Sequence, residues 1–164
     1  MTSQCPAIEW RPALRLTEAA FILDAAHRVL VRSGTKGLTL VAVAREAHVD
    51  VITVSYHFGT RHGLIEALMD RLYSEPIADF ADNAQHLPDP QQRWHAHLQS
   101  VRRMYQDRDA TLAYFEIAAL ALRDPALRLR LARLNDWTVD AFTEAIGRDA
   151  GPSAAALVSS TTPK

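Results

Sequence analysis

The sequence has a single cysteine, no long apolar run and no excess of positive charge. The single Cys5 cannot form an intramolecular disulfide, which suits a reducing compartment. No run approaches the ~18 apolar residues of a membrane span, and the N-terminus lacks the apolar core of a secretory signal. We therefore expect a cytoplasmic protein with no membrane partner and a flexible tail over residues 1–16.

The charge balance excludes a strongly basic nucleic-acid footprint. The 18 basic and 19 acidic residues give a formal net charge of −1. Residues 1–75 contain eight of each sign, and residues 76–164 contain ten basic and eleven acidic side chains. Any contact with DNA must therefore depend on the local placement of side chains and on dimerisation.

Motifs for catalysis and metal binding are also missing from the sequence. It has no Gly-rich phosphate loop after a strand, no nucleophile elbow and no paired His/Glu metal spacing. His95 and His97 are two residues apart, so on a helix they point to different faces. We expect no catalytic residue, no metal and no cofactor. An enzyme whose site is assembled from distant residues is the rival class.

Apolar residues recur at helical spacing through most of the chain. Residues 17–33 form the first predicted helix, with Thr17 as N-cap and Gly34 as the left-handed residue that ends it. Thr39 is predicted to cap a second helix over residues 40–47.

The rest of the pattern is helical as well. Thr60 is predicted to cap a longer helix that Pro76 ends or kinks. The stretches "LPDP" and "RDP" separate the later segments. Further helices are predicted over residues 91–106, 109–122 and 126–146. Because no strands are paired by hairpin turns, the predicted fold class is all-α.

Residues 49–58, "VDVITVSYHF", have the β-branched composition of a strand. An isolated strand would leave its backbone groups unpaired in an all-helical chain. A short helix resolves this, because the Asp50 side chain can cap amides two or three residues on, and Val54 and Phe58 share an inward face. Two short helices behind a longer one form a helix-turn-helix, whose second helix enters the DNA major groove.

The segment "ILDAAHRVLVRSGTKGLTLVAVAREAHVDVITVSYHFGTRHGLIEAL" resembles the DNA-binding domain of TetR-type (tetracycline-repressor-like) bacterial transcriptional regulators. The likeness covers residues 17–75, which we interpret as a three-helix DNA-binding domain. Residues 76–164 resemble the helical ligand-binding and dimerisation domain of that family, apparently short at the C-terminus. The resemblance implies a homodimer that binds double-stranded operator DNA and releases it when a small molecule occupies the C-terminal domain.

Five residues depart from the family pattern, among them His62 and Gly63, which replace acidic residues that normally help to cap the following helix. His48 stands where the turn usually has glycine, and histidine tolerates the left-handed conformation better than most residues do. Ser55 replaces a common tyrosine that helps to hold phosphate, and Arg61 replaces the usual lysine.

The predicted DNA-binding residues lie on and around the second helix of the motif. Val51, Ile52 and Thr53 are expected to contact base edges, where their methyl groups can pack on thymine. Tyr56, His57 and Arg61 are expected to contact phosphates. The alternative is an ordinary solvated face. The complete set is Thr39, Val51, Ile52, Thr53, Ser55, Tyr56, His57 and Arg61.

A second candidate site is an effector pocket lined by aromatic and a few polar residues. An ordinary helical core is the alternative for each of them. Glu116 is the most suggestive, because a carboxylate on an apolar helix needs a ligand or a partner such as Arg103 or Arg123. The set is Trp94, His97, Met104, Tyr105, Tyr114, Phe115, Glu116 and Trp137.

Taken together, these features predict a DNA-binding transcriptional repressor controlled by a small molecule. The alternative is a truncated regulator that acts as an interaction protein and lacks competent operator binding. Self-association distinguishes the two, because operator binding needs two recognition helices about 34–36 Å apart.

Overall fold

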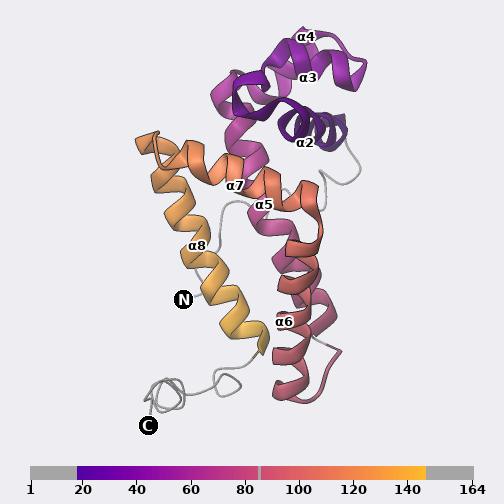
Figure 1. Cartoon of the computed structure of the whole chain (residues 1–164), viewed down its shortest axis with the longest axis vertical. Coiled ribbons are helices and arrows are strands. Elements are labelled where there is room, and N and C mark those ends of the chain that lie inside the picture. The colour runs from indigo at the N-terminus through magenta and orange to yellow at the C-terminus, as the bar shows by residue number, and fades with distance from the viewer. Residues whose placement is uncertain (1–17, 85, 147–164) are drawn as a thin grey trace.

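The computed structural model describes residues 18–84 and 86–146, and every regular element in these residues is a helix. The helices are α2 (Glu18–Gly37), α3 (Leu40–Ala47), α4 (Val51–Phe58), α5 (Arg61–Ala84), α6 (Pro90–Gln106), α7 (Arg108–Ala121) and α8 (Pro125–Ile146). The predicted all-α class is confirmed (Figure 1). The predicted tail over residues 1–16 and the Thr17 cap lie outside the described residues.

Helices α2, α3 and α4 form a helix-turn-helix at one end of the molecule (Figure 1). The predicted cap of α3 is confirmed, because the Thr39 hydroxyl oxygen accepts a hydrogen bond from the Ala42 amide at 3.1 Å. His48 follows α3 in the left-handed conformation, with φ 54° and ψ 39°, as predicted. Gly34 breaks the regular helix in α2 with φ 64°. Buried apolar side chains from the three helices close the unit around Val54.

One local prediction is wrong, and one of the two outcomes predicted for Pro76 is excluded. Asp50 precedes α4, but its side chain makes no capping hydrogen bond; its backbone carbonyl instead accepts from the Thr53 and Val54 amides. Pro76 does not end its helix, because α5 continues to Ala84. Pro76 is exposed, whereas the next turn buries apolar side chains against the body, and this packing outweighs the lost backbone hydrogen bond. One helix therefore runs from the helix-turn-helix into the body.

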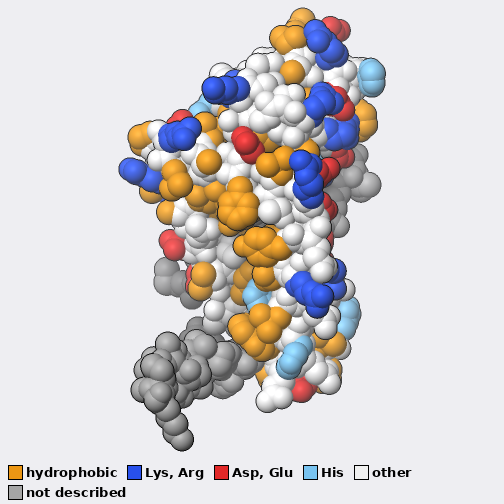
Figure 2. Space-filling view, in the orientation of Figure 1, with side chains coloured by type: hydrophobic (Ala, Val, Ile, Leu, Met, Phe, Trp, Pro, Cys, Tyr) orange, Lys and Arg blue, Asp and Glu red, His pale blue; other side chains and the backbone are white. Residues whose placement is uncertain are grey.

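The body consists of the distal part of α5 together with α6, α7 and α8. In the space-filling view, hydrophobic side chains gather along the line between α6 and α8 (Figure 2). Two large apolar side chains of α6 are largely exposed, Leu98 at 48% and Tyr105 at 55%. Helix α6 lies at the edge of the body and has no buried residue. Its apolar face is therefore wider than the surface of the neighbouring helices that it packs against.

An aromatic cluster joins α5, α6 and α8 at the far end of the body. The His97 ring centroid lies 4.1 Å from that of Phe142, 5.4 Å from that of Phe80 and 5.6 Å from that of Trp94. Among the described residues, the buried His97 Nδ1 has no hydrogen-bond partner. Burial lowers the pKa of His97 below its ordinary 6.5, because protonation would place a charge among these rings.

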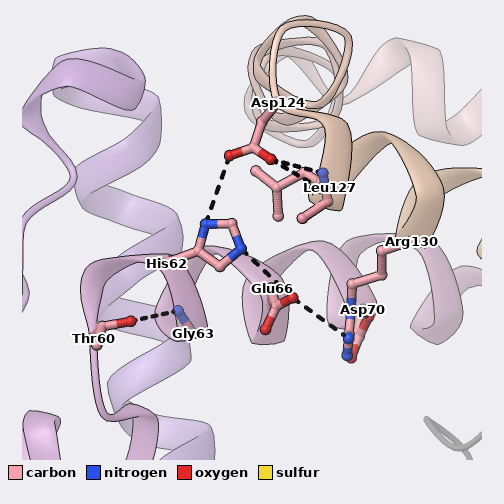
Figure 3. Close-up of polar contacts among 9 residues, drawn as sticks. Thr60, His62, Gly63, Glu66, Asp70, Asp124, Leu127 and Arg130 are labelled. Carbon is pink, nitrogen blue, oxygen red and sulfur yellow. Dashed lines mark hydrogen bonds and ion pairs between the residues drawn. The ribbon is translucent and has the colours of Figure 1, made fainter.

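Polar side chains tie the start of α5 to α8 (Figure 3). Asp70 is only 4% exposed, and the Arg130 guanidinium donates to both of its carboxylate oxygens, with Nε to Oδ1 at 2.7 Å. Burial raises the pKa of the Asp70 carboxyl, while Arg130 acts against that shift. Nearer the start of α5, His62 lies 3.7 Å from both Glu66 and Asp124. These contacts fix the angle between α5 and α8.

Replacing Arg130 with alanine should destabilise the fold by roughly 3 kcal/mol, because it leaves a buried carboxylate without its partner. Asp70→Ala should have a smaller effect, since the Arg130 side chain is 39% exposed and can reach water. Urea unfolding at neutral pH measures both. Arg128→Ala, an exposed neighbour on α8, is the control and should stay within about 0.5 kcal/mol of wild type. Equal losses for Arg130→Ala and Arg128→Ala would contradict the structural role of the pair.

Acidification should reduce stability through His97. Because its folded pKa is lowered, the unfolded chain binds a proton at higher pH than the folded chain does. Stability is therefore lost as pH falls below about 6.5 and levels off below the folded pKa. Urea unfolding from pH 7.5 to 5 should show a smaller acid loss for His97→Phe than for wild type. His95→Gln, which removes an exposed histidine on the same helix, should retain the full loss. An unchanged acid loss in His97→Phe would count against this assignment.

Candidate nucleic-acid interface and body pocket

Helix α4 presents apolar side chains to solvent. Ile52 is 77% exposed, Tyr56 is 84% exposed and Val51 is 39% exposed, whereas Val54 is fully buried. Helical periodicity separates Val54, which faces α2 and α3, from Ile52 and Tyr56 on the opposite side. Val51 is partly exposed as the first residue of α4. The end of the molecule that carries α3 and α4 shows hydrophobic and basic side chains together (Figure 2). Such a surface is suited to contact with base edges and phosphates.

The hydroxyl groups of the predicted set have different environments. Thr53 is half-buried on α4. The Ser55 hydroxyl donates to the Gly59 carbonyl at 3.0 Å and so helps to close the end of α4. Thr39 is exposed, and its oxygen caps α3. These contacts place all three residues at or beside the exposed side of the motif.

Two predicted phosphate-binding side chains already have partners within the chain. His57 Nε2 lies 3.1 Å from a carboxylate oxygen of Glu18. The Arg61 guanidinium donates to the carbonyls of Leu38, at 2.7 Å, and of Thr35. No local pattern signals these contacts, since each joins residues that are more than 20 positions apart. The geometry gives both side chains a part in holding the motif together.

Basic side chains around α3 were not part of the predicted set. Arg28 and Arg32 on α2 both pair with Glu46, at 2.9 Å, and their hydrogen bonds lower the pKa of that carboxyl. Lys36 and Arg45 are exposed at the ends of α2 and α3. The sequence signal that could have added them to the predicted set is their position in the last turn of each helix. They add positive charge beside α4 in a unit whose total charge is balanced.

Glu116 connects the body to the helix-turn-helix. Its Oε2 accepts a hydrogen bond from the backbone amide of Thr35 at 3.1 Å, so its partner is a main-chain group, where a side chain such as Arg103 or Arg123 was expected. The neighbouring Gly34 has a φ of 64°, a backbone conformation that residues other than glycine rarely adopt. The turn after Gly34 is thus held from two sides, by a carboxylate on α7 and by the Arg61 guanidinium on α5.

A pocket of about 740 Å³ opens between α2, α5, α6 and α7. Of the predicted pocket residues, Met104 and Tyr114 line it. The Tyr114 ring stacks on Tyr73 with 4.5 Å between ring centroids. His27 also lines the pocket, and its pKa is lowered, first by burial and then by the Arg71 charge.

The other predicted pocket residues lie elsewhere. Trp94 and His97 belong to the aromatic cluster at the far end of the body. Tyr105 and Phe115 are largely exposed, and Trp137 is half-buried on α8. The lining includes charged residues of α2 and α5 that were not predicted, because their spacing is typical of solvated helix faces. Among the described residues, no group of three potential ligands could hold a metal ion, and no helix could cross a membrane.

Comparisons with known proteins give the same assignment for the first unit. The family described as bacterial regulatory proteins, tetR family, matches residues 22–68. The HTH-type transcriptional regulators BetI of Burkholderia thailandensis and of Paraburkholderia phymatum are each 38% identical to this chain over 56 residues. That segment is 34% of this chain and 29% of each relative, so the match spans less than a third of the curated relatives.

A solved structure extends the likeness into the body. The crystal structure of multidrug binding protein EbrR complexed with imidazole superposes with a TM-score of 0.61 at 29% sequence identity. The alignment covers 86% of this chain and 73% of that one. Together with the capped helix-turn-helix, these matches identify residues 22–68 as a DNA-binding domain of the tetR family of bacterial regulatory proteins, on a chain whose fold resembles that of EbrR.

Proposed function

We propose that this chain is a transcriptional repressor that acts in the cytoplasm as a homodimer, binds operator DNA through α4 and releases it when a small molecule enters the body pocket. The exposed apolar side of α4, on a helix-turn-helix whose preceding helix is well capped, is the observation that carries this proposal. The family match over residues 22–68 supports DNA binding, and the complex of EbrR with imidazole supports a small-molecule effector.

The residues on α4 divide by role. Val51, Ile52 and Thr53 lie in its first turn, which in a helix-turn-helix is the part that meets base edges. Tyr56, one turn later, is suited to a phosphate contact that strengthens binding to any sequence. Arg61 acts by holding the turn before α3 in place, so that α3 and α4 meet DNA as one rigid unit.

Release of DNA requires a physical link between pocket and motif. Tyr114 lines the pocket, and Glu116, two residues on, reaches the turn after Gly34. A ligand that displaces α7 would therefore move the carboxylate that holds this turn. The ligand can shift the DNA-binding equilibrium only by its difference in affinity for the two arrangements.

Substitutions on α4 should separate base contacts from phosphate contacts. Ile52→Ala should weaken operator binding roughly tenfold and leave binding to unrelated DNA unchanged, because it removes only a base contact. Tyr56→Ala should weaken both. Fluorescence anisotropy on the DNA upstream of the gene, over a salt series, measures these affinities.

Leu98→Ala, an exposed apolar substitution on α6, is the matched control and should bind DNA as wild type does. All three variants should unfold within about 0.5 kcal/mol of wild type, because the side chains are exposed. If Ile52→Ala and Tyr56→Ala bind all DNA as wild type does, α4 is not the recognition helix. A monomer that binds every sequence weakly would favour the interaction protein without competent operator binding.

Removing the Glu116 carboxylate should loosen the turn that it holds. We expect Glu116→Ala to speed hydrogen exchange at the Thr35 amide by roughly tenfold, since that N–H loses its acceptor. Glu116→Gln retains an acceptor oxygen and should show a smaller increase. Nuclear magnetic resonance of the free protein measures the exchange residue by residue. The Ala42 amide, capped by Thr39, is the internal reference. Unchanged exchange at Thr35 in Glu116→Ala would refute the link.

A further inference from the structure

The body pocket has more acidic than basic side chains although the chain as a whole is balanced. Its charged lining comes from four separate elements: α2, α5, α6 and the residue that joins α6 to α7. The acidic residues are Asp24, Glu75, Asp79 and Asp107, and the basic residues are Arg71 and Arg103. Four carboxylates against two guanidinium groups give the lining a formal charge of −2, compared with −1 for all 164 residues.

One of the two guanidinium groups is occupied by the protein. Arg71 Nη2 donates to Asp24 at 2.5 Å, Nε donates to Glu75 at 3.1 Å, and Nη1 donates to the Ala20 carbonyl at 3.0 Å. Since each of its nitrogens has a partner, Arg71 offers little to an anionic ligand. Together with Asp24 and Glu75 it forms an ion-pair group with a formal charge of −1. An anion would meet Arg103 as the remaining cation of the lining.

His27 adds no positive charge at neutral pH, because its pKa lies below the ordinary value of 6.5. Burial is the main cause, and the charge of Arg71 is the second. Asp107 and Asp24 act on the same ring in the opposite direction, from different elements. Carboxylates of α2 and of the residue between α6 and α7 therefore both lie close enough to influence this ring.

Apolar and aromatic surface completes the site. Phe80 and Met104 line it together with Tyr114, whose ring is held by stacking on Tyr73. Aromatic faces attract cations, and the pocket volume of about 740 Å³ suits a drug-sized molecule. Such a lining can hold the apolar part of a ligand while the carboxylates interact with its charge.

From this arrangement we propose that the pocket takes organic cations with an apolar body and discriminates against anions of the same size. The inference rests on the proposed function of this pocket as the effector site, and it adds the chemical class of the effector. The carboxylates give the pocket its preference for charge, and the apolar and aromatic side chains contact the apolar body of the ligand.

Tetraphenylphosphonium and tetraphenylborate test this directly, because they match in shape and differ in the sign of their charge. Isothermal titration calorimetry on the full chain, without DNA and in a sodium buffer of low ionic strength, measures both. We expect the cation to bind at least roughly tenfold more tightly than the anion, as a charge difference at a few ångströms predicts in a partly open site.

Two substitutions should change this preference in opposite directions. Glu75→Gln removes a carboxylate and releases one donor of Arg71, so cation binding should weaken roughly five- to tenfold. Arg103→Gln removes the remaining cation, so binding of the phosphonium should strengthen and binding of the borate should weaken. Asp136→Asn and Arg102→Gln are matched controls, because both are exposed and lie outside the lining. Neither control should alter either affinity.

Equal or tighter binding of the borate to wild type would overturn the proposal, and so would binding of neither ion. Affinities that do not change in Glu75→Gln and Arg103→Gln would overturn it as well. Failure of this ligand-class proposal can be distinguished from failure of the proposed function. Intact operator binding without a preference for cations would reject only the ligand class, whereas a preference for cations without operator binding would reject only the repressor.

Discussion

The continuity of α5 is the constraint on which the rest of the structure depends. The helix from Arg61 to Ala84 packs against α2 and α4 at its start and against α6, α7 and α8 further along. Pro76 would interrupt an isolated helix, yet buried side chains on both sides of it hold the backbone in register. Because the DNA-binding unit and the body share this element, a change in packing around its distal half can reach α4 without a flexible joint.

Polar side chains between the body and the helix-turn-helix fix how the helices are placed. The exposed apolar side chains of α4 remain available to contact a partner. Glu116 and Arg61 bind the amide and the carbonyl of the same turn residue, Thr35. Asp70 and Arg130 fix α5 against α8. Hydrogen bonds with charged partners are directional, so these contacts set angles between helices that apolar packing alone would leave adjustable.

Local signals predicted the elements well, because they depend on neighbours in sequence. The Thr39 cap, the left-handed His48 and the bounds of α3 each follow from a few adjacent residues. The errors have a tertiary cause. Pro76 is overridden by packing, and the partner of Glu116 is a backbone amide 81 positions away. The candidate recognition face followed from periodicity, whereas the pocket lining combines residues of α2, α5, α6 and α7 that no local pattern relates.

The net charge gave no indication of either candidate site, because it is a sum over the whole chain. The balanced total conceals local differences: Lys36 and Arg45 are exposed at the ends of α2 and α3, whereas four of the six Asp, Glu, Lys and Arg residues that line the body pocket are acidic. The DNA and the organic cation that we propose as ligands need fields of opposite sign, so the local placement of charge matters more for each site than the total does. Helix α5 contributes to both regions, since it packs against α4 and also lines the pocket from Leu68 to Asn83.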